Sequence, residues 1–304
     1  MLSPDDLRFF IAVANASSLA AAARALNVSA PAVTQRLHAL EGRLGTHLID
    51  RKGRRPTLTD EGELLAERGR AVLIALSELD EALAERRGQV TGHLRIIAPL
   101  GFGRRYVAPI AASFQEEHPH VKIDLTLSDR LAGVPSSSWD LAVQVDEPRN
   151  ATPSLIMRTL ASNARLVCAA PSYLKAFGTP VAPQDLQAHS CIALRENDED
   201  VTLWRFGTLG GGPDVRIRIQ PHLASNDGEV VRTWALAGRG IIVRSEWDVA
   251  DDLRAGRLVR ILRDHPLPDA PVIALLGSGH QARAARTGRF LDALANALNP
   301  VPWR

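Results

Sequence analysis

The sequence predicts an α/β protein in two parts. The first part is mostly helical and ends in a short hairpin and a long helix, and the second consists of two small α/β lobes. Three observations carry this prediction: helical apolar spacing in residues 4–45, a seven-residue repeat within residues 59–87, and strand-like runs that alternate with helical patterns after His93. With 304 residues, of which 45% are hydrophobic, the chain has enough material for more than one packed core.

Composition and charge exclude several classes of protein. The formal net charge is only +2, so any basic binding site must be local. The two cysteines, Cys168 and Cys191, are too few for a disulfide framework, and their apolar surroundings favour buried thiols over a redox pair. The start, "MLSPDDLRFF", has no basic leader, and no window approaches roughly 18 uninterrupted apolar residues. We therefore expect a cytoplasmic protein with no membrane partner.

The N-terminal residues are expected to form three short helices. The first carries an apolar stripe of Leu7, Phe10, Ile11 and Ala14. Ser17 or Ser18 can cap the second helix, "LAAAARAL", which ends near Asn27. Asparagine tolerates the left-handed backbone of a tight turn, and Ser29 can cap the third helix. Two helices joined in this way form a helix-turn-helix, here at about residues 19–38.

The third helix combines an apolar face with a neutral polar face. Its apolar residues are Val33, Leu37, Leu40 and Leu44. Pro31, in the first turn, Thr34, Gln35 and His38 lie on the opposite face, where surface helices usually carry glutamate and lysine. Neutral hydrogen-bonding side chains suit the major groove of DNA, where Thr34 can contact a thymine methyl and Gln35 can pair with adenine. Ser29 and the first amides of this helix can hold a phosphate.

A basic hairpin follows this helix. Residues 46–58, "THLIDRKGRRPTL", predict a two-stranded wing with Gly53 at its tip. Four positive charges lie within residues 51–55, and residues 1–60 hold eight basic against five acidic side chains, a balance of +3. Cations that displace the counterions of a duplex increase affinity for every DNA sequence. The alternative is an alanine-rich three-helix domain whose polar face and basic loop contact another protein.

Thr59 can cap a long helix that runs to about Arg87, within an expected linker of residues 59–91. The apolar residues of this helix have heptad spacing. They are Leu65, Val72, Leu76, Leu79 and Leu83. This spacing predicts a dimerisation seam in which Gly69 is the one weak position. The alternative is an amphipathic helix that lies on its own domain.

The pattern of the second half predicts parallel sheets covered by helices, because strand-like runs alternate with helical patterns. The runs are "LRIIA", "VKIDLTL", "DLAVQV", "ARLVCAA", "CIAL", "VRIRIQ", "GIIVR" and "PVIALLG". The nine histidines are scattered, and the glycines of residues 210–212 and 277–279 lack the strand-to-helix context of a nucleotide loop. The sequence therefore gives little support to an enzyme, and no metal or cofactor is expected.

The string "LRFFIAVANASSLAAAARALNVSAPAVTQRLHALEGRLGTHLIDRKGRRPTLTDEG" resembles the DNA-binding domain of LysR-type transcriptional regulators. The match runs almost without gaps from Leu7 through Gly62 and includes "LNVS", the P-A-V-T register, LE-x-x-LG, the arginine-bearing wing and LT-x-x-G. The segments "GHLRIIAP", "CAAPSYLKAFGTP" and "GRGIIV" are similar to the effector-binding domain of the same family.

The resemblance implies a winged helix-turn-helix in residues 1–60 and a periplasmic-binding-protein-like effector domain in residues 92–304. Lobe I of that domain would comprise about residues 92–162 and 267–304, and lobe II about residues 163–266. The resemblance also implies a homodimer or homotetramer on double-stranded promoter DNA, a transcriptional response to a small molecule, and contact with RNA polymerase.

The expected DNA contacts lie on the third helix and in the wing. They are Ser29, Ala30, Pro31, Thr34, Gln35, His38, Arg51, Arg54, Thr57 and Thr59. Many family members have glutamine at the position of Ala30 and arginine at the position of Gln35. Base preferences therefore cannot be transferred from the family to this chain.

The effector is expected between the lobes, at strand ends and helix N-termini. The first strand ends before "PLGFGRR", where small residues expose backbone amides and the helix dipole favours an anion, such as an organic acid. The expected contacts are Leu100, Gly101, Phe102, Asp146, Ser225, Asn226, Asp227, Gly240 and Ile241. Gln144 replaces the arginine of the common "DLAVR", so the cleft is expected to differ there. Arg104 and Arg105 either add charge at its mouth or lie on the surface of the next helix.

Two functions remain open on these grounds. The first is a LysR-type regulator that binds promoter DNA as an oligomer and responds to an anionic effector. The alternative is a cytoplasmic small-molecule receptor whose N-terminal helices contact another protein. A free-standing solute receptor would leave residues 1–60 without a role and would require an export signal. Binding to a DNA fragment at low salt separates the first two functions.

Overall fold

The computed structural model describes residues 2–50, 57–87, 89–129, 138–146, 155–195, 201–207, 214–276 and 284–304. It divides the chain into two units, Met1–Arg87 and Gly88–Arg304. Within the ranges described, no helix combines the length and the apolar content that crossing a bilayer requires.

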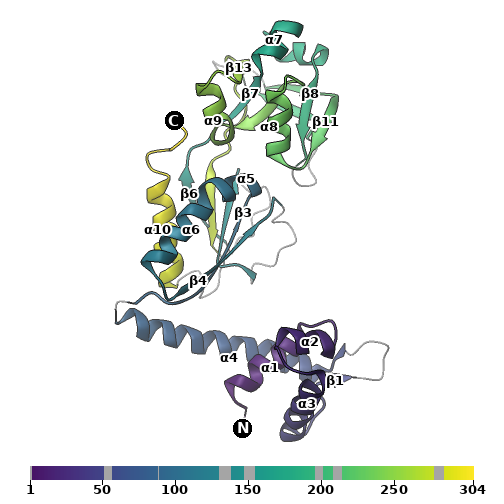
Figure 1. The fold of residues 1–304 in the computed structure, drawn as a ribbon, viewed down its shortest axis with the longest axis vertical. Helices are drawn as coiled ribbons and strands as arrows, with labels where there is room; N and C mark the ends of the chain where they lie inside the picture. The colour runs from purple at the N-terminus through teal and green to yellow at the C-terminus, as the bar shows by residue number, and fades with distance from the viewer. Residues whose placement is uncertain are drawn as a thin grey trace. The chain divides into compact units, whose positions relative to one another are not determined.

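The first unit consists of four helices and a two-stranded sheet (Figure 1). The elements are α1 (Pro4–Ala14), α2 (Leu19–Ala25), α3 (Ala30–Leu44), β1 (Ile49–Asp50), β2 (Thr57–Leu58) and α4 (Asp60–Glu85). Ser3, Ser18 and Ser29 cap the first three helices, each through its side chain and a backbone N–H three residues later. Ser18, rather than Ser17, is therefore the N-cap of α2. Asn27 has a φ of 53°, the left-handed conformation that the turn between α2 and α3 requires.

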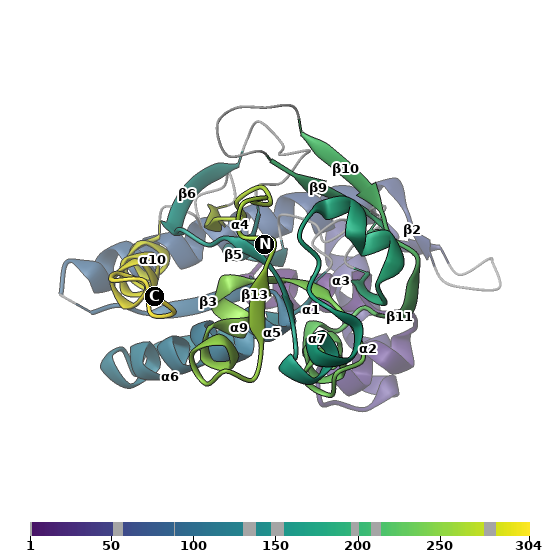
Figure 2. The same cartoon turned by 90° about the horizontal axis from the view of Figure 1, so that it is seen from above.

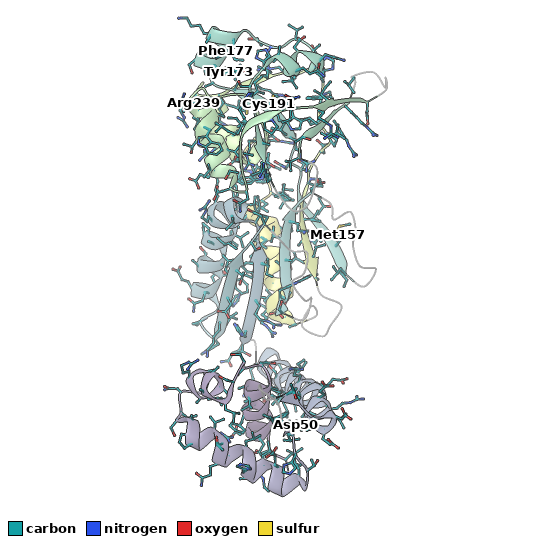
Figure 3. The ribbon with its side chains drawn as sticks, turned by 90° about the vertical axis from the view of Figure 1, so that its right-hand side faces the viewer. Asp50, Met157, Tyr173, Phe177, Cys191 and Arg239 are labelled. Atoms are coloured by element: carbon teal, nitrogen blue, oxygen red, sulfur yellow. The ribbon has the colours of Figure 1, made fainter. Side chains whose placement is uncertain are left out.

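A buried carboxylate ties the end of α3 to the wing. Glu41 is 5% exposed and accepts hydrogen bonds from the backbone N–H groups of Leu48 (2.9 Å) and Ile49 (3.4 Å). β1 and β2 then pair antiparallel, and Asp50, labelled in Figure 3, lies opposite Thr57. Residues 51–56, with the expected tip at Gly53, lie outside the described residues.

The start of α4 is fixed by Thr59 and Gly62. The Thr59 hydroxyl donates to the His47 carbonyl (2.7 Å) and accepts from the Gly62 N–H (3.1 Å). A Cβ atom on Gly62 would lie 2.1 Å from the carbonyl oxygen of Leu48. The LT-x-x-G motif therefore holds α4 against the base of the wing, and only glycine fits at that contact.

An ion pair joins α1 to α3. Arg43 Nη2 lies 2.6 Å from Asp6 Oδ1, and this hydrogen bond lowers the pKa of Asp6 from 3.8 to about 2. A carboxyl group whose pKa is lower in the folded state stabilises the fold above its unfolded pKa. That contribution is lost as the pH falls through about 2.

We therefore expect Arg43→Met to destabilise the first unit at pH 5 and to flatten its response to acid. Without the guanidinium, the pKa of Asp6 rises towards its ordinary value, so less stability remains to be lost between pH 4 and 2. Thermal unfolding of the wild type and the variant across this range measures the effect. Parallel stability curves would show that the pair does not control the pKa of Asp6.

Lobe I of the second unit is a five-stranded sheet with helices α6 and α10 packed together on it (Figure 1). Its elements are β3 (Gly92–Ala98), α5 (Leu100–Phe102), the π-helical turn η1 (Gly103–Val107), α6 (Ala108–Glu117), β4 (Val121–Leu127), β5 (Leu141–Val145), β6 (Ile156–Ala161), β14 (Val272–Leu276) and α10 (Ala285–Ala297). The strand order is β4-β3-β5-β14-β6. β3 runs parallel to β4 and β5, whereas β14 is antiparallel to both β5 and β6.

Lobe II is built from short strands and helices between β6 and β14. They are β7 (Arg165–Ala169), α7 (Pro171–Phe177), η3 (Pro183–Ala188), β8 (Cys191–Leu194), β9 (Leu203–Phe206), β10 (Val215–Arg218), β11 (Pro221–Ser225), α8 (Gly228–Leu236), β12 (Ile242–Ser245), α9 (Glu246–Arg254) and β13 (Val259–Ile261). β7 pairs antiparallel with β12 and β13, β8 pairs parallel with β11, and β9 and β10 form an antiparallel pair, side by side in Figure 2.

The expectation of parallel sheets therefore holds only for part of the second unit. The chain passes from lobe I to lobe II after β6 and returns before β14, and β14 runs antiparallel to its two neighbours β5 and β6. Asn163 joins these two passages: its side-chain amide donates to the Ala270 carbonyl (2.8 Å), and its backbone carbonyl accepts from the Ala270 N–H (2.9 Å).

Candidate functional site

The outer face of α3 is exposed, as a surface that binds a large partner must be. Ser29, Ala30, Pro31, Gln35 and His38 are exposed, while Val33 and Leu37 are buried in the unit's core. Thr34 is partly exposed, and its hydroxyl donates to the carbonyl of Ala30 (3.1 Å), which leaves its oxygen able to accept. The face is thus neutral and rich in hydrogen-bonding groups.

The positive charge near this face is partly engaged within the unit. Arg36 stacks over the ring of Phe9, 4.5 Å from its centroid, and also donates to the Asp5 carbonyl. Arg8 and Arg43 pair with carboxylates on α1. These pairs leave the wing as the main candidate for phosphate contacts, but Arg51 and Arg54 lie outside the described residues.

The two wing threonines differ in their surroundings. Thr57 is exposed on β2, whereas the hydroxyl of Thr59 is engaged with the His47 carbonyl and the Gly62 N–H. The structure therefore gives Thr59 a capping role at the start of α4. His38 lies 3.6 Å from Glu41, on the edge of the α3 face.

The heptad residues of α4 fall into two groups. Val72, Leu76, Leu79 and Leu83 are between 37% and 57% exposed. Leu65 instead packs against the core of the first unit, and Gly69 faces α1, where a Cβ atom would lie 3.1 Å from Leu7 Cδ2. Gly69 is thus the close contact between α1 and α4 rather than a weak point in the seam.

In the second unit a cavity of about 460 Å³ is lined by residues of α5, β5, α8, β12 and α9, among others. Its wall includes Leu100, Gly101, Gln144, Asp227, Arg244 and Trp247. Gly101 lies close against Trp247, because an added Cβ atom would lie 3.0 Å from the ring and the ring would have to give way. The size is in the range of pockets for small organic molecules, about 300–1,000 Å³.

Three of the expected effector contacts lie in packed cores instead. Phe102 is fully buried in lobe I and meets Trp247 edge to face, with ring centroids 5.4 Å apart. Ile241 is fully buried in lobe II, where its backbone bonds to Ser190 and Ile192. A Cβ atom on Gly240 would lie 2.5 Å from the Ser190 carbonyl oxygen, so this glycine serves close packing of the chain rather than the cavity.

The remaining expected contacts lie beside the cavity or on its wall. Asp227 is on the wall and caps α8 by accepting from the N–H of Glu229 (2.7 Å). The Ser225 hydroxyl accepts a hydrogen bond from the Asp227 N–H and so helps to hold the capping residue in place. Neither Ser225 nor Asn226 is among the described residues that line the cavity. Asp146 forms an ion pair with Arg165, which is a wall residue.

Arginines on the cavity wall are paired with carboxylates. Arg104 bonds to Glu229 of α8 (2.8 Å), Arg105 pairs with Asp251 of α9, and Arg244 bonds to Asp248 (2.8 Å). Arg104 and Arg105 are both exposed, as the surface alternative expects, and each links lobe I to a helix of lobe II. Arg232 adds one hydrogen bond, from Nη1 to Asp252 Oδ2 (3.0 Å).

Two further features give the cavity its shape and charge. The guanidinium of Arg244 covers Gly228, where a Cβ atom would lie 2.1 Å from Nη2. The Asp129 carboxylate accepts a hydrogen bond from the Leu100 N–H (2.9 Å). The backbone amide expected to bind an anionic ligand is therefore already bonded to a carboxylate of the protein. Burial raises the pKa of Asp129.

Sequence reasoning missed Asp129, Arg165, Arg232 and Trp247. The signal available for Trp247 was "RSEWD", a cluster of charged and aromatic residues directly after a buried strand. The other three depend on contacts between distant segments, which local patterns do not encode.

Neither cysteine is placed for redox chemistry. Cys168 and Cys191 are buried, and burial raises the pKa of each thiol to about 12. Figure 3 shows Cys191 in lobe II, in the cluster that also contains Tyr173. In the part of the chain that the structure covers, no group of histidine, cysteine and acidic side chains could hold a metal ion.

Two family models match the two units. Residues 4–63 match the bacterial regulatory helix-turn-helix protein, lysR family, and residues 87–299 match the LysR substrate binding domain. The chain belongs to the LysR family. LysR-type transcriptional regulators bind DNA through the first domain and small-molecule effectors through the second, and the protein is such a regulator.

Named members of the LysR family align over most of the chain. The HTH-type transcriptional regulator DmlR of Escherichia coli K12 is 35% identical over 264 residues, covering 87% of this chain and 85% of DmlR. PtxR of Pseudomonas aeruginosa is 32% identical over 306 residues, covering 100% and 95%. The LysR-type structure of CrgA from Neisseria meningitidis has a TM-score of 0.61 at 27% identity, covering 98% of this chain and 99% of CrgA.

Proposed function

We propose that the exposed face of α3 reads base edges in the major groove of promoter DNA while the wing contacts phosphates. The exposed neutral face, presented by a helix that follows the tight turn at Asn27, is the observation that carries this proposal. Ser29, Ala30, Pro31, Thr34, Gln35 and His38 supply the α3 contacts, and Arg51, Arg54, Thr57 and Thr59 those of the wing and its exit. A protein-binding role for the N-terminal helices has no comparable support in this family.

The exposed apolar side chains of α4 support a dimer formed along that helix, and we propose that two dimers form a tetramer on DNA. Val72, Leu76, Leu79 and Leu83 would meet their counterparts in a second copy. Contact with RNA polymerase and a cytoplasmic location belong to the same proposal.

The cavity between the lobes is the proposed effector site, and an anionic small molecule such as an organic acid is the proposed ligand. Leu100, Gly101 and Asp227 are the sequence-predicted contacts that lie on its wall. Because the wall arginines are already paired with carboxylates of the protein, a ligand carboxylate would have to replace one of these carboxylates to bind an arginine. The pair Arg104–Glu229 is suited to exchange, because its side chains are 49% and 57% exposed and such pairs contribute little to stability.

DNA binding tests the first part of the proposal. Arg54→Ala is expected to weaken binding to the chain's own upstream intergenic fragment and to unrelated DNA alike, and to reduce the salt slope by about 1. Gln35→Ala is expected to cost about 1–3 kcal/mol on the specific fragment only. Fluorescence anisotropy across a salt series measures both effects.

Lys122→Ala is the matched control, because it removes an exposed cation from β4 in the second unit. It is expected to leave affinity and salt slope unchanged. If the wild-type protein does not bind the intergenic fragment at low salt, the DNA-binding proposal is wrong. An unchanged salt slope in Arg54→Ala would contradict only the proposed phosphate contacts of the wing and would leave the α3 contacts in place.

A further inference from the structure

Two uncharged polar atoms on the cavity wall lack hydrogen-bond partners. Among the residues that the structure describes, neither Gln144 Oε1 nor Trp247 Nε1 has one, although both atoms are buried. The Trp247 side chain as a whole is 5% exposed. Buried polar groups in folded proteins are nearly always satisfied, so an exception at a ligand cavity indicates a missing partner.

Packing holds the Trp247 side chain, and the sheet holds the backbone of Gln144. The Trp247 ring is held between Gly101 and Phe102, and the backbone N–H of Trp247 donates to Asn163 Oδ1 (3.3 Å). Gln144 lies on β5, inside the lobe I sheet, opposite Ile273 of β14. The rigid setting of Trp247 therefore fixes where a ligand atom that accepts from its indole N–H would have to lie.

Several charged groups nearby, in contrast, already have hydrogen-bond partners within the protein. Arg104, Arg165 and Arg244 bond to carboxylates of the protein, and the Asp129 carboxylate accepts from the Leu100 N–H. Arg232 Nε on the wall also lacks a hydrogen-bond partner in the part of the chain that the structure describes, but its charge is paired with Asp248, 3.8 Å away. Among the described wall residues, the unsatisfied groups that carry no charge are one carboxamide oxygen that accepts and one indole N–H that donates.

We propose that Gln144 and Trp247 form a subsite that recognises a hydroxyl group of the effector. The inference rests on the proposed function, in which the cavity binds that effector. A hydroxyl both donates and accepts, so it satisfies a carboxamide oxygen and an indole N–H, whereas a carboxylate can only accept and leaves Gln144 Oε1 without a donor. The arginine that many family members have at position 144 would favour a carboxylate there instead.

Matched pairs of acids that differ by one hydroxyl test the subsite. Lactate with propionate, and para-hydroxybenzoate with benzoate, are titrated calorimetrically into the full-length chain. The hydroxylated member is expected to bind at least roughly ten-fold more tightly, and Gln144→Leu or Trp247→Phe should reduce the ratio to about two-fold or less. Equal or absent binding of both members, or a ratio unchanged in the variants, overturns the subsite.

A second measurement needs no ligand. Because leucine removes an unsatisfied buried oxygen, Gln144→Leu is expected to raise the Tm of the unliganded chain by about 2 °C. Gln187→Leu, at an exposed glutamine of η3, is the control and should not change Tm. A lower Tm in Gln144→Leu would show that Oε1 is already satisfied. DNA binding by the unliganded wild type, measured in parallel, reports on the proposed function alone.

Discussion

Replacing Gly62 by valine is expected to destabilise the first unit by about 3 kcal/mol or more and to abolish DNA binding. The added Cβ atom would lie 2.1 Å from the Leu48 carbonyl oxygen, a backbone atom that cannot rotate away. Either α4 or the base of the wing must shift, and both are joined through Thr59. Thermal unfolding and anisotropy with the intergenic fragment measure the two losses.

Gly42→Ala is the control for a glycine substitution in the same unit. Gly42 is exposed on α3, and a Cβ atom there would meet nothing within 4 Å. Alanine should stabilise the helix by about 0.5–1 kcal/mol. Wild-type stability in Gly62→Val would mean that the contact between α4 and the wing is not fixed as described.

Leu76→Asp is expected to break the oligomer and with it high-affinity DNA binding. Leu76 is 37% exposed on α4, and a carboxylate at the centre of an apolar seam would be desolvated without a partner. The affinity for the intergenic fragment should fall at least roughly ten-fold, because a single DNA-binding domain replaces several linked ones. Analytical ultracentrifugation gives the oligomeric state directly.

Ile74→Asp provides the matched control on the same helix. Ile74 is 39% exposed, close to the value for Leu76, but helical geometry places it on the opposite side of α4. It should leave assembly intact. An unchanged oligomer in Leu76→Asp would contradict the seam, and equal disruption by both substitutions would place the interface elsewhere on α4.

Sequence patterns predicted the first unit well where its geometry is local. Asn27 and Ser29 act within a few residues of their own positions, so their types alone indicated the turn and the cap. The role of Gly69 was not predictable in this way, because its contact with Leu7 joins residues more than sixty positions apart. The heptad pattern contained Gly69 without revealing which partner it faces.

The cavity was harder to predict. Strand direction is not encoded in apolar runs, so the antiparallel entry of β14 could not be derived from "PVIALLG". Phe102 and Ile241 lie next to segments at the cavity, but the side to which each residue points depends on tertiary packing. Gln144 was noticed only as a departure from a common motif, and the structure adds that its oxygen is unsatisfied.

The position of β14 within the lobe I sheet has a consequence for synthesis of the chain on the ribosome. β14 separates β5 from β6, so this sheet remains incomplete until residues 272–276 have been translated. Residues 1–87 need no later segment for their own core and can fold while the rest is still being made. A nascent DNA-binding domain can therefore form long before the lobe I sheet is complete.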